Sequence, residues 1–181
     1  MIWILLALAV VIFLVVVSYI NRIILLGNRV DNAWSQIDVQ LKKRVDLVPN
    51  LVETVKGYMK HEKDAISAVT KARERMLGAK TDEDRLKANS QIAGALKTIF
   101  ALAENYPNLK ANENFMMLQE ELSAVENKIA YSRQFYNDSI LMYNNLVSTF
   151  PGVIFAGIIG KEKKKHLEIT AEERKPVKVK F

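Results

Sequence analysis

The chain begins with an apolar run, residues 2–20, that carries no charged side chain. As a helix rising about 1.5 Å per residue, these 19 residues would reach roughly 28 Å, which matches the ~30 Å hydrocarbon core of a bilayer. A cleavable signal sequence is the alternative, but it would have a charged start, a shorter apolar core and a small-residue cleavage site. We therefore expect residues 1–22 to form a transmembrane anchor whose ends are marked by Ile2, Trp3, Tyr19 and Ile20.

The charges that flank this run predict its orientation. No charged side chain precedes it, whereas Arg22 and Arg29 follow it, and Lys42, Lys43 and Arg44 come next. Basic residues are enriched on the cytoplasmic side of membrane helices, so we expect the N-terminus outside and the rest of the chain in the cytoplasm of a single-pass cell-membrane protein. Long domains can cross membranes despite their charges, and the opposite orientation therefore stays open.

Composition narrows the classes of fold and partner. The absence of cysteine excludes disulfides, Cys-ligated metals and a cysteine nucleophile, and the 4 prolines and 7 glycines among 181 residues favour long helices. Residues 161–181 hold eight Lys or Arg against four Glu, which is +4 of the net charge of +6. We expect no nucleic-acid partner. An anionic membrane surface suits the tail better, with Lys161, Lys163, Lys164 and Lys165 as candidate lipid contacts.

Apolar residues recur every three or four positions from Val30 to Met59, which indicates one buried helix face. Pro49 lies within this stripe. A proline lacks the backbone donor and clashes with the carbonyl four residues earlier, so we expect a helix over about residues 28–77 that is kinked or broken there.

Two further helices follow from capping signals. Gly78 followed by Thr81 and Asp82 indicates a helix end and a new start, with either Thr81 or Asp82 as the cap, and Pro107 ends that second helix. Asn112 is placed to cap a last helix whose stripe is Phe115, Leu118, Leu122, Val125, Ile129, Ser132, Tyr136, Ile140, Tyr143 and Val147. The predicted fold is all-α: an antiparallel up-and-down bundle over residues 28–148, with three long helices, or four if the first breaks at Pro49.

Residues 149–160 form an apolar, glycine-containing segment, too short to span a membrane, that precedes the basic tail of residues 161–181. The segment either packs against the bundle or lies at the membrane interface.

Signatures of catalysis are missing from the sequence. There is no Glu-x-x-His pair, no phosphate-binding glycine loop and no nucleophile motif, and His61 and His166 lie in lysine-rich stretches typical of solvated surface. We expect no catalytic residues, no metal, no cofactor, no small-molecule substrate and no enzyme activity.

Several strings in the sequence are similar to those of one family. They are AWSQ at residues 33–36, RVDLVPNLVETVKGY at 44–58, YPNLKAN at 106–112, PVKVKF at 176–181, and the residues Phe115, Leu118, Gln119, Glu121, Leu122, Glu126, Asn127, Ile129, Ala130, Tyr136 and Asn137. On these strings the chain resembles the LemA family of bacterial membrane proteins. The resemblance implies a membrane segment followed by an up-and-down helical bundle, and it implies little chemistry. Some relatives look like lipoproteins, from which this cysteine-free chain departs.

Polar residues in and beside these strings are the candidate site. Asp46, Asn50 and Glu53 share one helix face, and four residues share a face of the last helix, Glu126, Arg133, Asn137 and Asn144. If the faces meet, Arg133 would pair with Glu53 or Asp46. Such residues form either a buried network that fixes helix register or a polar groove that receives a partner segment.

These features predict a membrane-anchored, non-enzymatic interaction or scaffold protein, with another membrane or envelope protein as its partner. The alternative is a lipid-surface module in which residues 150–165 bind or sense the bilayer.

Overall fold

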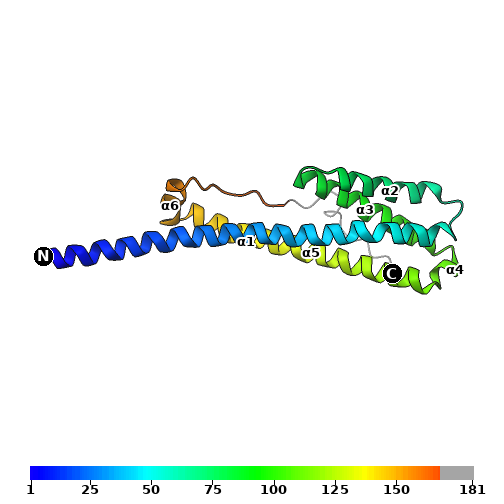
Figure 1. The fold of residues 1–181 in the computed structure, drawn as a ribbon, viewed down its shortest axis with the longest axis horizontal. Helices are drawn as coiled ribbons and strands as arrows, with labels where there is room; N and C mark the ends of the chain where they lie inside the picture. Colours follow the sequence, from blue (N-terminus) through cyan, green and yellow to red (C-terminus); the bar gives the residue numbers. More distant parts are fainter. Residues whose placement is uncertain (168–181) are drawn as a thin grey trace, which may run out of the picture. The chain divides into compact units, whose positions relative to one another are not determined.

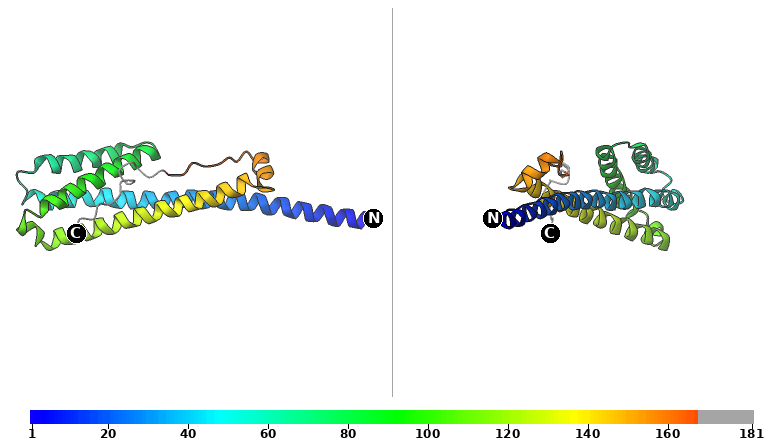
Figure 2. Two further views of the ribbon diagram at one scale, coloured as in Figure 1. Left: turned by 180° about the vertical axis from the view of Figure 1, so that it is seen from behind. Right: turned by 60° about the vertical axis from the view of Figure 1, so that its left-hand side comes forward.

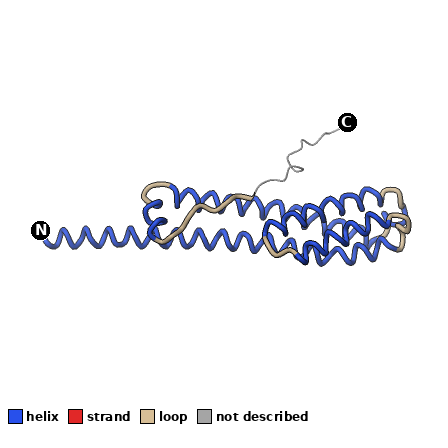
Figure 3. The backbone as a smooth tube through the Cα atoms, turned by 90° about the horizontal axis from the view of Figure 1, so that it is seen from above, coloured by secondary structure: helices blue, strands red, loops and turns tan. Residues whose placement is uncertain are grey.

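The computed structural model of the protein describes residues 1–167, and within them every regular element is a helix, as the sequence predicted (Figures 1 and 3). Residues 168–181 of the predicted basic tail, including the string at 176–181, lie outside the described residues. The helices are α1 (Ile2–Lys56), α2 (Lys63–Gly78), α3 (Asp82–Ala103), α4 (Pro107–Lys110), α5 (Glu113–Ser148) and α6 (Gly152–Ile158).

The chain divides into two compact units. The described part of unit 1 comprises residues 1–35 and 132–167, and unit 2 comprises residues 36–131. Helices α1 and α5 each contribute to both units. The bundle predicted over residues 28–148 therefore supplies residues to two cores, which are described separately below.

The expected break at Pro49 is wrong, because α1 runs through it without interruption to Lys56. Pro49 deprives the carbonyl of Val45 of its helical donor, and the Arg73 guanidinium on α2 replaces that donor with a 3.1 Å bond from Nε. A side chain from another helix thus satisfies the carbonyl that the proline leaves open.

The first break after the anchor falls at residues 57–62, so the helix expected to continue to residue 77 is two helices. The amides of Tyr58 and Met59 both bond to the Val55 carbonyl and close the end of α1. Gly57, a poor helix former, directly follows the last residue of α1 and favours a helix end there. Met59, two residues later, is buried in the core.

Of the capping residues predicted, Thr81 and Asn112 are confirmed, whereas Asp82 is the first residue of α3. The Thr81 hydroxyl accepts a 3.1 Å hydrogen bond from the amide of Asp84 and caps α3. Asn112 Oδ1 accepts a 3.0 Å bond from the amide of Phe115 and caps α5. Pro107 occupies the first turn of the short α4, where its missing N–H costs no helical bond.

Unit 2 is a helical bundle in which α2 and α3 form an antiparallel hairpin joined by residues 79–81 (Figure 2). The apolar stripe of α1 faces this core, and its buried members there begin at Ile37 and end at Val55. The other helices contribute Val69, Ala72, Met76, Ala88, Ile92, Leu96, Ile99, Ala103, Phe115, Leu122, Val125 and Ile129.

Unit 1 has a core between α1, the second half of α5, and α6. Trp34 packs edge-on against Tyr136 with ring centroids 5.6 Å apart. The buried cluster consists of Ile23, Val30, Ile140, Tyr143, Val147 and Ala156. Residues 149–160 pack in this unit through the buried Gly152 and Ala156.

Candidate functional site

Two asparagines on α5 hold the chain's own C-terminal segment by its main chain. Asn144 donates from Nδ2 to the carbonyl of Lys164 and accepts at Oδ1 from the Lys164 amide, both at 2.8 Å. Asn137 makes the same pair of bonds with Leu167, at 3.0 and 2.8 Å. Each amide side chain therefore replaces one residue of a neighbouring β-strand, and we call the pair the asparagine clamp.

The spacing of the clamp fits an extended chain. The seven residues that separate Asn137 from Asn144 advance an α-helix by about 10 Å. The three residues that separate Lys164 from Leu167 advance an extended chain by about the same length. The two asparagine side chains are therefore spaced to bond every third residue of an extended segment. The segment runs antiparallel to α5, since Asn137 pairs with Leu167 and Asn144 pairs with Lys164.

One side chain of the held segment is also recognised. Lys164 Nζ lies 2.7 Å from Asp31 Oδ1 on α1 and 5.7 Å from the centroid of the Tyr143 ring on α5. Burial raises the pKa of Tyr143 above its ordinary value, the Lys164 ammonium opposes that rise, and the Asp31 carboxylate adds to it. The ring and the carboxylate together provide a site for a cation. We call these four residues, Asp31, Asn137, Tyr143 and Asn144, the tail groove.

The connection from α6 to this segment is defined by local geometry. Gly160 adopts a positive φ of 63°, which L side chains rarely adopt. The Lys161 amide then bonds back to the Ala156 carbonyl at 2.9 Å and closes the end of α6. The chain leaves α6 at this glycine and passes to Lys164 in the groove.

The opposite end of unit 1 carries exposed apolar surface. Residues 1–15 of α1 are exposed, and Ile23 is the first buried residue of the chain. Within residues 1–167, α1 alone is by itself long and apolar enough to span a membrane, while α5 and α6 meet that test only as a pair bent by 90°. Phe155 of α6 packs on Tyr19 with ring centroids 5.3 Å apart. Apolar side chains are exposed on α6, at Val153, Ile154 and Ile158, and in the turn before it, at Phe150.

The other predicted site residues are distributed over both units. In unit 2, exposed Asp46 bonds to Lys42 at 2.7 Å, and Asn50 and Glu53 line a shallow depression. Half-buried Arg133 belongs to unit 1 with Asn137 and Asn144. Among the candidate lipid contacts, Lys164 is taken up by the tail groove, whereas the exposed ones are Lys161, Lys163 and Lys165.

Arg44 is a buried polar residue that was not among the predicted site residues. Its side chain is only 1% exposed, donates a 2.6 Å bond to Asn89 Oδ1 on α3, and forms an ion pair with Glu126 on α5. Burial lowers the pKa of Arg44 to about 10, so it remains charged at neutral pH. The available signal was a charged residue within the buried stripe, three positions after Leu41 and four before Val48.

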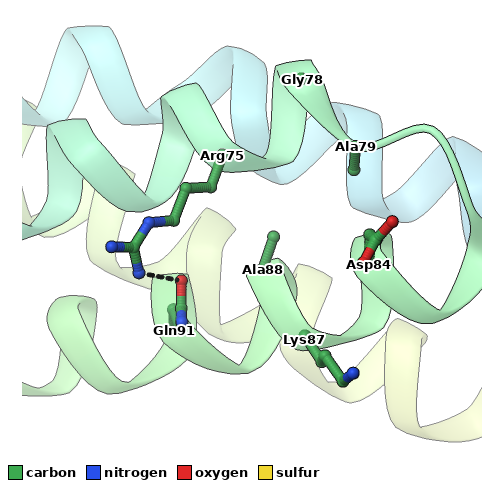
Figure 4. A pocket seen from close by; sticks show the side chains of 7 residues that line it. All are labelled: Arg75, Gly78, Ala79, Asp84, Lys87, Ala88 and Gln91. Atoms are coloured by element: carbon green, nitrogen blue, oxygen red, sulfur yellow. Dashed lines mark hydrogen bonds between the residues drawn. The ribbon is translucent and has the colours of Figure 1, made fainter.

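An opening of about 360 Å³ lies between α2 and α3 in unit 2 (Figure 4). The Arg75 guanidinium crosses it to bond Gln91 at 2.9 Å, and Asp84 and Lys87 lie at its other end. Within residues 1–167, no group of three or more His, Asp or Glu side chains is arranged to hold a metal ion.

The chain is similar to proteins of a known family. The model of the LemA family matches residues 33–181. A relative named Protein LemA, from Metamycoplasma hominis, is 28% identical over 142 residues. That alignment covers 76% of this chain and 64% of the relative, so the chain spans less than two thirds of the relative's length.

Proposed function

Because the chain belongs to the LemA family, we propose that it is a membrane-anchored, non-enzymatic interaction protein that binds an extended segment of another membrane or envelope protein. The asparagine clamp carries this proposal. Its four hydrogen bonds use only main-chain atoms of the held segment, at residues 164 and 167. Main-chain recognition of extended segments is a recurrent mode of peptide binding. In this mode the amides bind polypeptide and take no part in a reaction.

The proposed anchor is the exposed apolar part of α1. Its side chains are exposed over residues 1–15, and such an apolar surface requires lipid in place of water. Extraction of cell membranes with alkaline carbonate tests it. An anchored chain stays in the pellet, and a chain released into the supernatant would contradict the proposal.

We propose the orientation from charge, with both units in the cytoplasm. The cysteine-free chain allows a direct test with Lys71→Cys, an exposed position of α2. A membrane-impermeant maleimide should label this cysteine only after lysis of the cells. Equal labelling of intact and lysed cells would place both units outside the cytoplasm.

The interaction function is tested by photocrosslinking in intact membranes. Leu141 is exposed and lies between Asn137 and Asn144 on the same helix face, whereas exposed Met142 lies on another face. A photoreactive phenylalanine analogue at Leu141 should crosslink to a segment of a second membrane or envelope protein, identified by mass spectrometry. The same analogue at Met142 is the matched control. Equal yields at both positions, or adducts only within the chain, would contradict the proposal.

A second function is favoured by α6, whose exposed apolar face lies in unit 1 with Phe155 on Tyr19, at the predicted end of the anchor. We propose that α6 lies in the membrane interface and binds lipid, with Lys161 and Lys163 directed to the headgroups. A spin label at Ile158→Cys in bilayers should be reached by lipid-dissolved oxygen more than by a water-soluble relaxant. Lys97→Cys in unit 2 is the control and should give the reverse. A water-like response at Ile158 would exclude this function.

A further inference from the structure

The tail groove recognises a lysine in addition to the main chain, and this specifies what a partner segment must contain. We propose that the tail groove of unit 1 is a receptor for an extended, lysine-bearing segment of a partner polypeptide, and that the chain's own residues 164–167 are the competing occupant. The inference rests on the proposed interaction function and names the chemistry of the partner.

The clamp sets the main-chain requirements. At residues 164 and 167 it accepts a bond from the amide and donates one to the carbonyl, so any residue except proline fits both positions. Residues 165 and 166 lie between the two clamped positions, and their side chains are exposed. The groove therefore leaves the identity of these residues open.

The lysine requirement comes from the side of the groove. The Lys164 ammonium contacts the Asp31 carboxylate at 2.7 Å and lies over the Tyr143 ring, 5.7 Å from its centroid. Both groups attract a positive charge, and the negative face of the ring disfavours a carboxylate. A glutamate at this position would be repelled by both, so lysine is selected against acidic residues.

The interactions that bind residues 164–167 to the tail groove are weak enough for a partner segment to displace these residues. They consist of four neutral hydrogen bonds and one ion pair whose carboxylate is 71% exposed. Each such hydrogen bond and exposed ion pair contributes little to stability, because water competes for the same groups. A tethered segment has an effective concentration on the order of millimolar. A partner segment with better side-chain contacts can therefore compete with it.

The test uses the full chain in nanodiscs of zwitterionic lipid. The variant Lys164→Pro/Leu167→Pro removes both tail amides that donate to the clamp and leaves the groove intact. The probe is a fluorescein-labelled peptide, GKEKKKHLEI, copied from residues 160–169. By fluorescence anisotropy it should bind this variant at least about tenfold more tightly than the parent chain, because the cis competitor is weakened.

Two peptides of equal charge test the lysine. One carries glutamate in place of Lys164 and the other in place of Lys165, so general attraction to the protein is matched. The first should bind at least about tenfold more weakly than the second, which is about 1.4 kcal/mol. A peptide with proline at both clamped positions should not bind. Asn144→Ala in the proline variant should abolish binding of the parent peptide.

Excess parent peptide added to the unmodified chain gives a second readout that needs no variant. By releasing the tail, the peptide should speed hydrogen exchange at the amides of residues 164 and 167. Unchanged protection of these amides at saturating peptide would overturn the proposal that another segment can displace the tail.

The outcomes separate the two proposals. If no peptide binds either chain, the groove is only an internal contact and the interaction function fails with it. If both glutamate peptides bind equally well, the lysine requirement is wrong and the interaction function stands. If the parent chain is a dimer that dissociates in the proline variant, the occupant is the tail of a second copy, which overturns the assignment to a partner.

Discussion

The side-chain amide of Asn144 exchanges two 2.8 Å hydrogen bonds with the main chain of Lys164, one donated and one accepted. A pair of this kind is what two opposed residues of a β-ladder form, although one partner here is an α-helix. Asn137 repeats the pattern with Leu167. The asparagines thereby give a helix surface one property of a sheet edge, the capacity to bind main chain of almost any sequence.

Loss of one clamp residue should release the tail locally. Asn144→Ala removes two hydrogen bonds worth about 1–3 kcal/mol together. Hydrogen exchange at the Lys164 amide should then quicken by roughly ten- to hundredfold while α5 stays protected. Asn145→Ala, an exposed neighbour on the same helix, is the control and should leave exchange at Lys164 unchanged. Equal effects of the two substitutions would show that Asn144 does not hold the segment.

The contact between Arg73 and the Val45 carbonyl should matter only because of Pro49. Arg73→Met keeps most of the side-chain stem but leaves a buried carbonyl unsatisfied, at a cost of about 1–3 kcal/mol in unfolding free energy. With Pro49→Ala in place, the alanine amide can serve that carbonyl, so the same Arg73 substitution should cost less. Urea unfolding of the four chains in detergent, followed by circular dichroism, measures the coupling. Identical costs in the two backgrounds would contradict it.

The ion pair of Arg44 should contribute more than a surface pair of the same type. Glu126→Gln removes the anionic partner of a guanidinium that is only 1% exposed, and we expect a loss of about 1–3 kcal/mol in unfolding free energy. Because Glu126 is half-exposed, water replaces part of the interaction and limits the loss. The control is Glu121→Gln, since Glu121 faces Lys43 at 3.8 Å and both are exposed. Its loss should stay below about 0.5 kcal/mol.

Two glycines of α6 should respond in opposite ways to a methyl group. At Gly152 a Cβ atom would lie 2.1 Å from the Leu146 carbonyl oxygen, so the backbone must move. Gly152→Ala should lower the melting temperature of the chain, with a cost of about 1–3 kcal/mol. At Gly157 nothing lies within 4 Å of the corresponding position. Gly157→Ala should be neutral or stabilising by up to about 1 kcal/mol, because alanine is the better helix former. A melting temperature that Gly152→Ala leaves unchanged would argue against this packing of α6.

Elements governed by neighbouring residues were predictable from the sequence. The stripe of α5 follows the helical repeat, and the Thr81 and Asn112 caps depend on amides three residues away. The run of α1 through Pro49 was not predictable, because the donor that permits it is 28 residues away on α2. Long-range compensation of this kind leaves no periodic trace in a sequence.

The candidate site was predictable only where its residues follow a local helical pattern. Asn137 and Asn144 were recognised as polar residues sharing one helix face, as a groove for a segment would require. The segment they hold has no helical or strand pattern, and Lys164 was interpreted by its charge alone as a lipid contact. Arg44 was missed because a charge within an apolar stripe suggests an interruption, whereas here Asn89 and Glu126 satisfy it.

Because α1 is unbroken, it fixes the distance between the proposed edge of the bilayer and the cation site of the tail groove. Asp31 follows Tyr19 by twelve residues of one helix, so the cation site stands about 18 Å beyond the proposed edge of the bilayer. No hinge intervenes to vary that height. An extended polypeptide covers it in about five or six residues. The first residues after a membrane helix of another protein can therefore reach the groove, and a lysine there would arrive at the right level while its membrane helix stays in the bilayer.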